Sequence, residues 1–362
     1  MDSPPLISVS KLQSFPQLSP AAFQHPDDEK ATAALQKIPG ISTLVKSFGG
    51  GVVEKAARLN HLSECIRVGP NQAVHLYRVF VKTAEILSVP ALPELFISSA
   101  PGVNAYAMGM KQHTVVVTRG LIEALTIPEV MAVFGHELGH VKCNHMVNKT
   151  IASTIAEFGL NGLSKLVPVL GEAALLPVVA HLQYWSRMAE TSCDRAALLA
   201  VQDPKIVAGM LAKLGGWPSS LGDIDFQSLR EQGEEYDKLD DDKVSAVLKV
   251  INMLQSELYL THPLPIGRVR RILMWAESDM YQEILAGKYP RIDQAAPEPH
   301  CAVCGTVLTP SGQFCPICGT PAPVRLSGPS CRCGHPISDP RSKFCVSCGK
   351  PLGGTTGMSA GS

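Results

Sequence analysis

Two histidines four residues apart constrain this sequence more than any other feature. His136 and His140 bracket the run His-Glu-Leu-Gly-His. Residues at this spacing project from one face of an α-helix, about one turn from each other, so both imidazoles can take adjacent corners of a tetrahedral zinc site. Zinc lowers the pKa of a bound water to about 7, which lets the intervening Glu137 take its proton near neutral pH. The alternative, chance occurrence on an ordinary core helix, is expected in on the order of one such chain in a hundred.

A zinc enzyme needs a third protein ligand, and its identity separates the possible families. Metzincins carry Gly and His at the positions that Cys143 and Met146 occupy here. His145 is one position out of place, so we expect it to be structural. Glu190 is the best candidate, with Asp194 one helical turn later on the same face. A carboxylate ligand and a second carboxylate that orients a histidine would suit zinc, but the same spacing also fits a solvated helix face.

Several short patterns occur together in one order along the chain. They are Asn104-Ala105-Tyr106-Ala107, the run His136 to His140, Ser-Arg-x-x-Glu-x-x-x-Asp at Ser186 to Asp194, and Thr261-His262-Pro263 followed by Arg268. With this order and spacing, the region from about Ile38 to Tyr289 resembles the HtpX-like peptidases, a gluzincin family that also includes the CAAX prenyl protease type. Many relatives of this type have clear membrane-spanning helices, whereas this sequence does not show them.

The resemblance implies a role for several residues. It makes Glu190 the third zinc ligand and Asp194 the carboxylate that steadies a liganding histidine. Asn104 and Ala105 would lie at the strand along which an extended polypeptide substrate is added.

The resemblance also implies a reaction, namely zinc-dependent endopeptidase activity, with a possible role in protein quality control. Glu137 would be the general base, and no covalent intermediate is expected. His262 together with Arg268 would stabilise the anionic tetrahedral intermediate, which needs preorganised donors. On spacing alone, these two residues would be a loop histidine and a helix-surface arginine.

Hydrophobic periodicity predicts a mainly α fold with a small β-sheet, an α+β class. Thr126 and Glu129 have the form of a capping box at the start of the helix that carries the two histidines. Other helices are expected at 27–37, 41–62, 72–87, 178–201, up to Gly215-Gly216, 243–258 and 266–276, and strands at 95–98, 105–108 and 114–118.

Changes in composition predict the domain organisation. A flexible arm rich in Pro and Ser at 1–26 precedes a gluzincin metallopeptidase domain at 27–292. A linker at 293–299 leads to zinc-ribbon units at 300–320 and 329–350, which are followed by a disordered tail at 351–362.

Eight of the eleven cysteines lie after residue 300, in two similar units. Paired Cys-x-x-Cys knuckles followed by glycine resemble zinc ribbons, and metal would supply most of the folding free energy of such small units. Disulfides are the alternative. His335 is a possible substitute ligand in the second unit, which begins with a tighter Cys-x-Cys. The expected ligands of two structural zinc ions are Cys301, Cys304, Cys315 and Cys318 in the first unit, and Cys331, Cys333, Cys345 and Cys348 in the second.

Charge and hydropathy limit the partners and the compartment. Basic and acidic residues both number 32, and the tail has no dense basic patch, so nucleic acid is not an expected partner. Protein docking through the ribbons is favoured. The start of the chain has no signal-like pattern, and the apolar stretch 151–185 is interrupted by charges and prolines. We therefore expect a cytoplasmic protein with peripheral membrane contact at most. The rival function is a catalytically silent zinc scaffold that uses the peptidase fold and the ribbons for binding.

Overall fold

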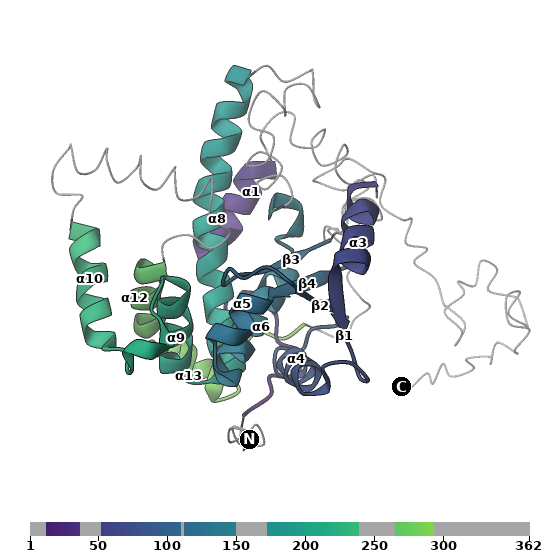
Figure 1. Ribbon diagram of the computed structural model, residues 1–362. Coiled ribbons are helices and arrows are strands. Elements are labelled where there is room, and N and C mark those ends of the chain that lie inside the picture. Colours follow the sequence, from purple (N-terminus) through teal and green to yellow (C-terminus); the bar gives the residue numbers. More distant parts are fainter. Residues whose placement is uncertain (1–11, 37–51, 110–111, 150–171, 239–264, 293–362) are drawn as a thin grey trace, which may run out of the picture.

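The structure is a computed structural model that describes residues 12–36, 52–109, 112–149, 172–238 and 265–292 (Figure 1). Several sequence predictions lie outside these ranges. They concern the start of the arm, the helix expected at 243–258, His262, the linker, both ribbon units and the tail.

The strands form a mixed four-stranded sheet in the order β1-β2-β4-β3. The strands are β1 (Cys65–Val68), β2 (Glu94–Ser98), β3 (Ala105–Met108) and β4 (Thr114–Thr118). β2 and β4 are parallel, while β1 and β3 pair antiparallel with β2 and β4, respectively. Every residue of β4 is buried, as its run of three valines predicts. In this strand order, β1 and β3 are the edge strands among those described.

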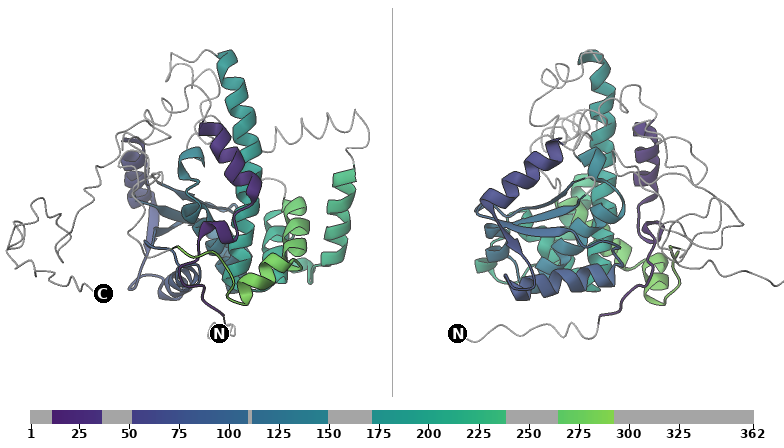
Figure 2. Two further views of the ribbon diagram at one scale, coloured as in Figure 1. Left: turned by 180° about the vertical axis from the view of Figure 1, so that it is seen from behind. Right: turned by 90° about the vertical axis from the view of Figure 1, so that its right-hand side faces the viewer.

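Helices cover both sides of this sheet (Figure 2). α3 (Val52–Glu64) and α4 (Val74–Ile86) lie on opposite sides of it, and α5 (Arg119–Ala124) follows β4 directly. The helix of the two histidines, α6 (Ile127–Lys142), begins at the predicted N-cap, where a Glu129 carboxylate oxygen accepts a hydrogen bond from the backbone amide of Thr126 (2.7 Å). Nearly the whole helix is buried, so its position is fixed by packing on several sides.

The remaining helices form a second layer beside α6. α8 (Glu172–Val201) is the longest described helix and runs through the height of the molecule, with α9 (Pro204–Leu214), α10 (Phe226–Lys238), α12 (Pro265–Ala276) and α13 (Asp279–Leu285) on its side away from the sheet (Figure 1). A single 3₁₀ turn, Ser219–Leu221, lies between α9 and α10. No helix within the described ranges is both apolar enough and long enough to cross a bilayer.

The N-terminal segment is packed onto the domain, so the prediction of a flexible arm is wrong for residues 12–26. Phe15, Leu18 and Phe23 are completely buried, and the backbone amide of Phe15 donates to the carbonyl of Ile86 (3.0 Å). A 3₁₀ turn, Pro20–Ala22, leads into α1 (Pro26–Gln36), which lies along α8. Three buried apolar side chains hold a segment whose proline and serine content had suggested mobility.

The same segment pairs with the end of the domain. Leu18 and Arg291 form an antiparallel β-bridge. The amide of Ser19 donates to the carbonyl of Pro290 (3.0 Å), and the amide of Ile292 donates to the carbonyl of Gln17 (2.7 Å). Residues from the two ends of the described chain thus form one small structural unit.

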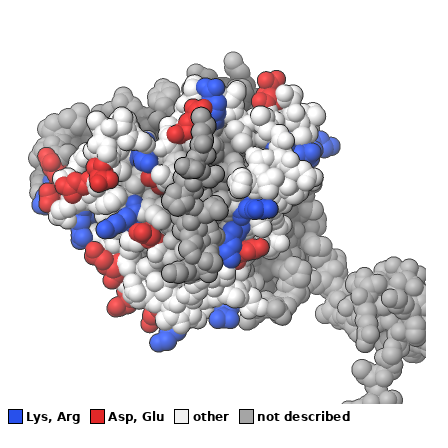
Figure 3. Space-filling model, turned by 60° about the horizontal axis from the view of Figure 1, so that its bottom comes forward, with Lys and Arg blue, Asp and Glu red and all other residues white. Residues whose placement is uncertain are grey.

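The surface carries both signs of charge. Figure 3 shows basic and acidic side chains intermixed over the face that it presents, as the formal net charge of zero would suggest.

The packed N-terminal segment predicts a large stability effect at Phe15. Phe15→Ala removes a completely buried ring and should lower the free energy of unfolding by about 3–5 kcal/mol. Leu221→Ala, at a side chain that is 65% exposed, is the control and should have little effect. Urea unfolding of both variants checks this, and equal stabilities would contradict the packing of the segment.

Candidate active site

Two glycines let α6 and α8 approach almost to backbone contact. A Cβ atom added at Gly135 would lie 2.7 Å from the Cβ of Ala200, and one at Gly139 would lie 2.9 Å from the Cβ of Ala196. Side chains at either position would push the helices apart, because protein interiors leave no room for such overlap. The close approach brings the middle of α8 against the histidine face of α6.

Glu190 of α8 faces both histidines of α6. One carboxylate oxygen lies 3.3 Å from Nε2 of His136, and the other lies 3.2 Å from Nε2 of His140. All three side chains are almost completely buried. Donor atoms that share a tetrahedral zinc ion with bonds of about 2.0–2.1 Å lie about 3.3 Å apart. Two imidazole nitrogens and a carboxylate at this separation therefore fit a zinc ion.

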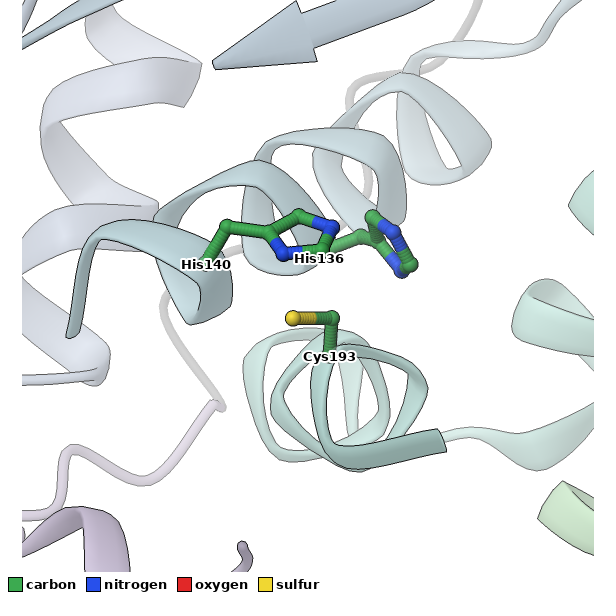
Figure 4. Close-up of side chains that lie close together, drawn as sticks. All are labelled: His136, His140 and Cys193. Carbon is green, nitrogen blue, oxygen red and sulfur yellow. The ribbon is translucent and has the colours of Figure 1, made fainter. Parts of the chain in front are cut away.

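Cys193 offers a second candidate donor on α8 (Figure 4). Donor atoms of His136, His140 and Cys193 lie within 4.8 Å of one another. However, the sulfur of Cys193 lies 3.7 Å from Nδ1 of His145. Because this nitrogen is 3.0 Å from Nδ1 of His140, the sulfur approaches the Nδ1 side of the His140 ring. Burial raises the pKa of the Cys193 thiol well above its ordinary value. The carboxylate of Glu190 lies instead on the Nε2 side of both rings.

Asp194 holds the other side of the His136 ring. One of its oxygens lies 3.0 Å from Nδ1 of His136, and Arg268 donates to both oxygens of the carboxylate (2.8 and 2.6 Å). Burial alone would raise the pKa of Asp194, but Arg268 and His136 hold it below the ordinary value. The carboxylate is therefore ionised and can fix the orientation of the imidazole.

Arg268 lies at the site, where its guanidinium is paired with carboxylates of the protein. Its guanidinium is only 2% exposed, and a second contact joins it to Glu190 (2.9 Å). Burial would lower its pKa, yet Asp194 and Glu190 raise the pKa above its ordinary value. The sequence predicted that Arg268 would contact the transition state. In the structure, two protein carboxylates engage its side chain. His262, the other residue with that predicted role, lies outside the described residues.

His145, which the sequence predicted to be structural, has two partners that sequence reasoning missed. It lies between Nδ1 of His140 and a carboxylate oxygen of Asp28 on α1, 3.0 Å from each.

Burial, together with the charge of Lys149, lowers the pKa of His140 well below its ordinary value despite the opposing effect of Glu190. A neutral imidazole is the form that binds a metal.

A small pocket opens beside Glu137. Residues of α6, β3, α5, α9 and α12 line it, so both layers of the fold contribute. Ala105, one of the predicted substrate-binding residues, lines it together with His136 and Glu137, whereas its neighbour Asn104 is held to β4 through Thr118. The other lining residues are Leu121, Val133, Met210, Leu214 and Arg268.

Comparison with known proteins identifies the family. The model for peptidase family M48 matches residues 70–276, which include the whole of α6, α8 and α12. The chain belongs to peptidase family M48. The HtpX-like resemblance drawn from the sequence is therefore confirmed, and the protein is a zinc metallopeptidase.

Three relatives illustrate the similarity. The plastoglobule-localized metallopeptidase 48 of the chloroplast from Arabidopsis thaliana is 36% identical over 274 residues, which cover 75% of this chain and 77% of that protein. The protease HtpX homolog of Acaryochloris marina is 28% identical over 233 residues (57% and 73%). That of Moorella thermoacetica is 30% identical over 220 residues (54% and 70%). No solved structure matches the chain.

The glycine contact between α6 and α8 predicts the cost of a single methyl group. Gly135→Ala forces the overlap with Ala200 described above, so overpacking should lower the free energy of unfolding by about 1–3 kcal/mol. It should also weaken zinc binding, because α8 would move away from the histidines. The matched control is Gly267→Ala, on α12, where an added Cβ meets nothing within 3.5 Å. Thermal unfolding and zinc titration measure the two effects. Unchanged stability of Gly135→Ala would contradict the close packing.

The buried ion pair of Arg268 predicts a pH-dependent loss of stability. Arg268→Gln leaves the carboxylates of Asp194 and Glu190 without their cation, which should cost about 3–5 kcal/mol at neutral pH. Because the pKa of Asp194 is lower in the folded state, the pair stabilises the fold above the unfolded pKa of about 4 and loses this effect as the pH falls through the folded value. Urea unfolding from pH 7 downwards should therefore show the difference from wild type shrinking in acid. A difference that stays constant would contradict this account.

Proposed function

We propose that this M48 peptidase is an endopeptidase whose catalytic zinc is held by His136, His140 and Glu190. The observation that carries the proposal is the carboxylate of Glu190, whose two oxygens lie 3.3 and 3.2 Å from the Nε2 atoms of the two histidines. Three ligands of this type leave one tetrahedral position open, as catalytic zinc sites require. Asp194 keeps His136 in the tautomer that presents Nε2 to the metal.

Glu137 acts as the general base in this proposal. When zinc is bound, it supplies a Lewis acid that lowers the pKa of water and polarises the scissile carbonyl. Glu137 takes the proton of the attacking water and passes it to the leaving amine. Its place in the pocket lining, next to a ligand histidine on the same helix, supports this role.

The substrate is an unfolded or extended polypeptide. β3, at the edge of the described sheet, contributes Ala105 to the pocket, and an extended peptide can add to such an edge as a further strand. The apolar side chains of Leu121, Val133, Met210 and Leu214 favour an apolar substrate residue beside the scissile bond. Asn104 acts indirectly, because its backbone bonds to Thr118 hold the start of β3 in place.

Arg268 is assigned a positioning role here, since its contacts with Glu190 and Asp194 fix both carboxylates. His262 remains the predicted donor to the developing oxyanion.

The wider biology is also a proposal. Two structural zinc ions in the tail cysteines and a protein-docking role for that region rest on the cysteine spacing. A role in protein quality control rests on the HtpX resemblance. A cytoplasmic location remains the prediction, with peripheral membrane contact as the alternative, whereas the name of the Arabidopsis relative places that protein at chloroplast plastoglobules.

The decisive test compares cleavage of an unfolded protein by zinc-loaded wild type and by Glu137→Gln. The variant keeps the shape of the side chain and removes the base, so its rate should fall by a factor of at least about 100, while its zinc content stays unchanged. Glu123→Gln, an exposed glutamate on α5 with 65% of its side chain accessible, serves as the matched control and should cleave like wild type.

Other outcomes are informative as well. Equal cleavage by wild type and Glu137→Gln would contradict the assigned base. Absence of cleavage by all three, with zinc bound, would favour the scaffold function over the peptidase.

A further inference from the structure

We propose that Asp28 and His145 are positioning residues for His140, so that the N-terminal helix α1 completes the metal site. This inference rests on the proposed function, in which His140 holds zinc through Nε2. It assigns part of the site to a segment that lies before the region matched by the family, since Asp28 precedes residue 70.

Three buried side chains form a continuous line from the metal site to α1. Nδ1 of His140 lies 3.0 Å from Nδ1 of His145, and Nε2 of His145 lies 3.0 Å from a carboxylate oxygen of Asp28. None of the three residues is more than 1% exposed. Hydrogen bonds in such a water-excluded place are strong and directional, so they can fix ring orientations.

The chemistry of a ligand histidine sets the direction of each hydrogen bond. An imidazole that binds metal through Nε2 carries its proton on Nδ1, so His140 must donate to Nδ1 of His145. His145 then carries its own proton on Nε2 and donates it to Asp28. Every ring nitrogen along this line has a defined role, and the line ends on an acceptor-only carboxylate.

Asp28 is itself held firmly. The same carboxylate oxygen accepts from the hydroxyl of Ser192 on α8 (2.7 Å) and from the side-chain amide of Gln24 (3.1 Å). The Ser192 hydroxyl also accepts from the backbone amide of His25 (3.0 Å). These bonds fasten the start of α1 to the helix that carries Glu190. Both figures of the fold show α1 lying beside α8 (Figures 1 and 2).

In this arrangement, His136 and His140 each have a carboxylate on the Nδ1 side of the ring. Asp194 contacts Nδ1 of His136 directly, whereas Asp28 reaches Nδ1 of His140 through the ring of His145. Partners of this kind fix the tautomer and raise the basicity of a ligand, and their loss commonly lowers metal affinity 10–100-fold. A merely structural role for Asp28 would instead predict a change in stability without a specific effect on zinc.

The test measures zinc affinity of the full chain by competition with a chelator. Each value is read as the difference from the same variant carrying His136→Ala, because the tail cysteines can also take zinc. Asp28→Asn keeps the shape of the side chain and removes the charge. Asp27→Asn makes the same change one residue away at a partly exposed position, and Ala31→Gly loosens α1 at a buried residue that is not a member of the line.

We expect Asp28→Asn to weaken zinc binding about 10–100-fold, while Asp27→Asn and Ala31→Gly bind zinc as wild type does. Circular dichroism confirms that each variant is folded. Should Asp28→Asn fail to fold, the pair at His145 carries the test. His145→Leu removes both hydrogen bonds, whereas His145→Gln can accept one and donate the other, so it should retain tighter binding than His145→Leu.

Two results would overturn the inference. One is wild-type zinc affinity in folded Asp28→Asn or in folded His145→Leu. The other is a loss in Ala31→Gly as large as that in Asp28→Asn, which would mean that only the packing of α1 matters. Failure of the proposed function would look different, because wild type itself would then show no zinc binding that depends on His136.

Discussion

The site depends on how closely α6 approaches α8. Two glycines on α6 face alanines on α8, and this contact determines the distance from His136 and His140 to Glu190. Helices with ordinary side chains at a contact lie 8–10 Å apart, and a carboxylate as short as glutamate would then reach its partners less well. Small residues at this helix contact are therefore as necessary to the geometry of the site as its polar residues.

Burial of so many charged and polar groups in one place is possible because nearly every group has a partner of the opposite kind. Arg268 neutralises Asp194 and Glu190, and Asp28 gathers donors from three elements. Taking any one of these charges out of water would be costly by itself. The network is thus the condition under which a polar centre can exist between two apolar helices, and it makes distant segments of the chain depend on one another.

The sequence predicted what local patterns encode. Periodicity and a capping box predicted α6, and short strand-like runs predicted three of the four strands. Short or strongly polar elements such as β1, α5, α10 and α13 lack such patterns and were missed. Glu190 could not be separated from a solvated helix face by spacing, and only the order of several patterns singled it out. Asp28 gave no signal, because an acidic residue in a first helical turn is common wherever it complements the helix dipole.

The bridge between Leu18 and Arg291 has a consequence for the order of events during synthesis. A ribosome adds roughly 5–20 residues per second, so roughly 15–50 s separate the appearance of these two partners. During that time Leu18 has been made, but its partner has not. Arg268, which pairs with Asp194 and Glu190, is also made late, so the buried polar network is complete only when the domain has been almost entirely translated.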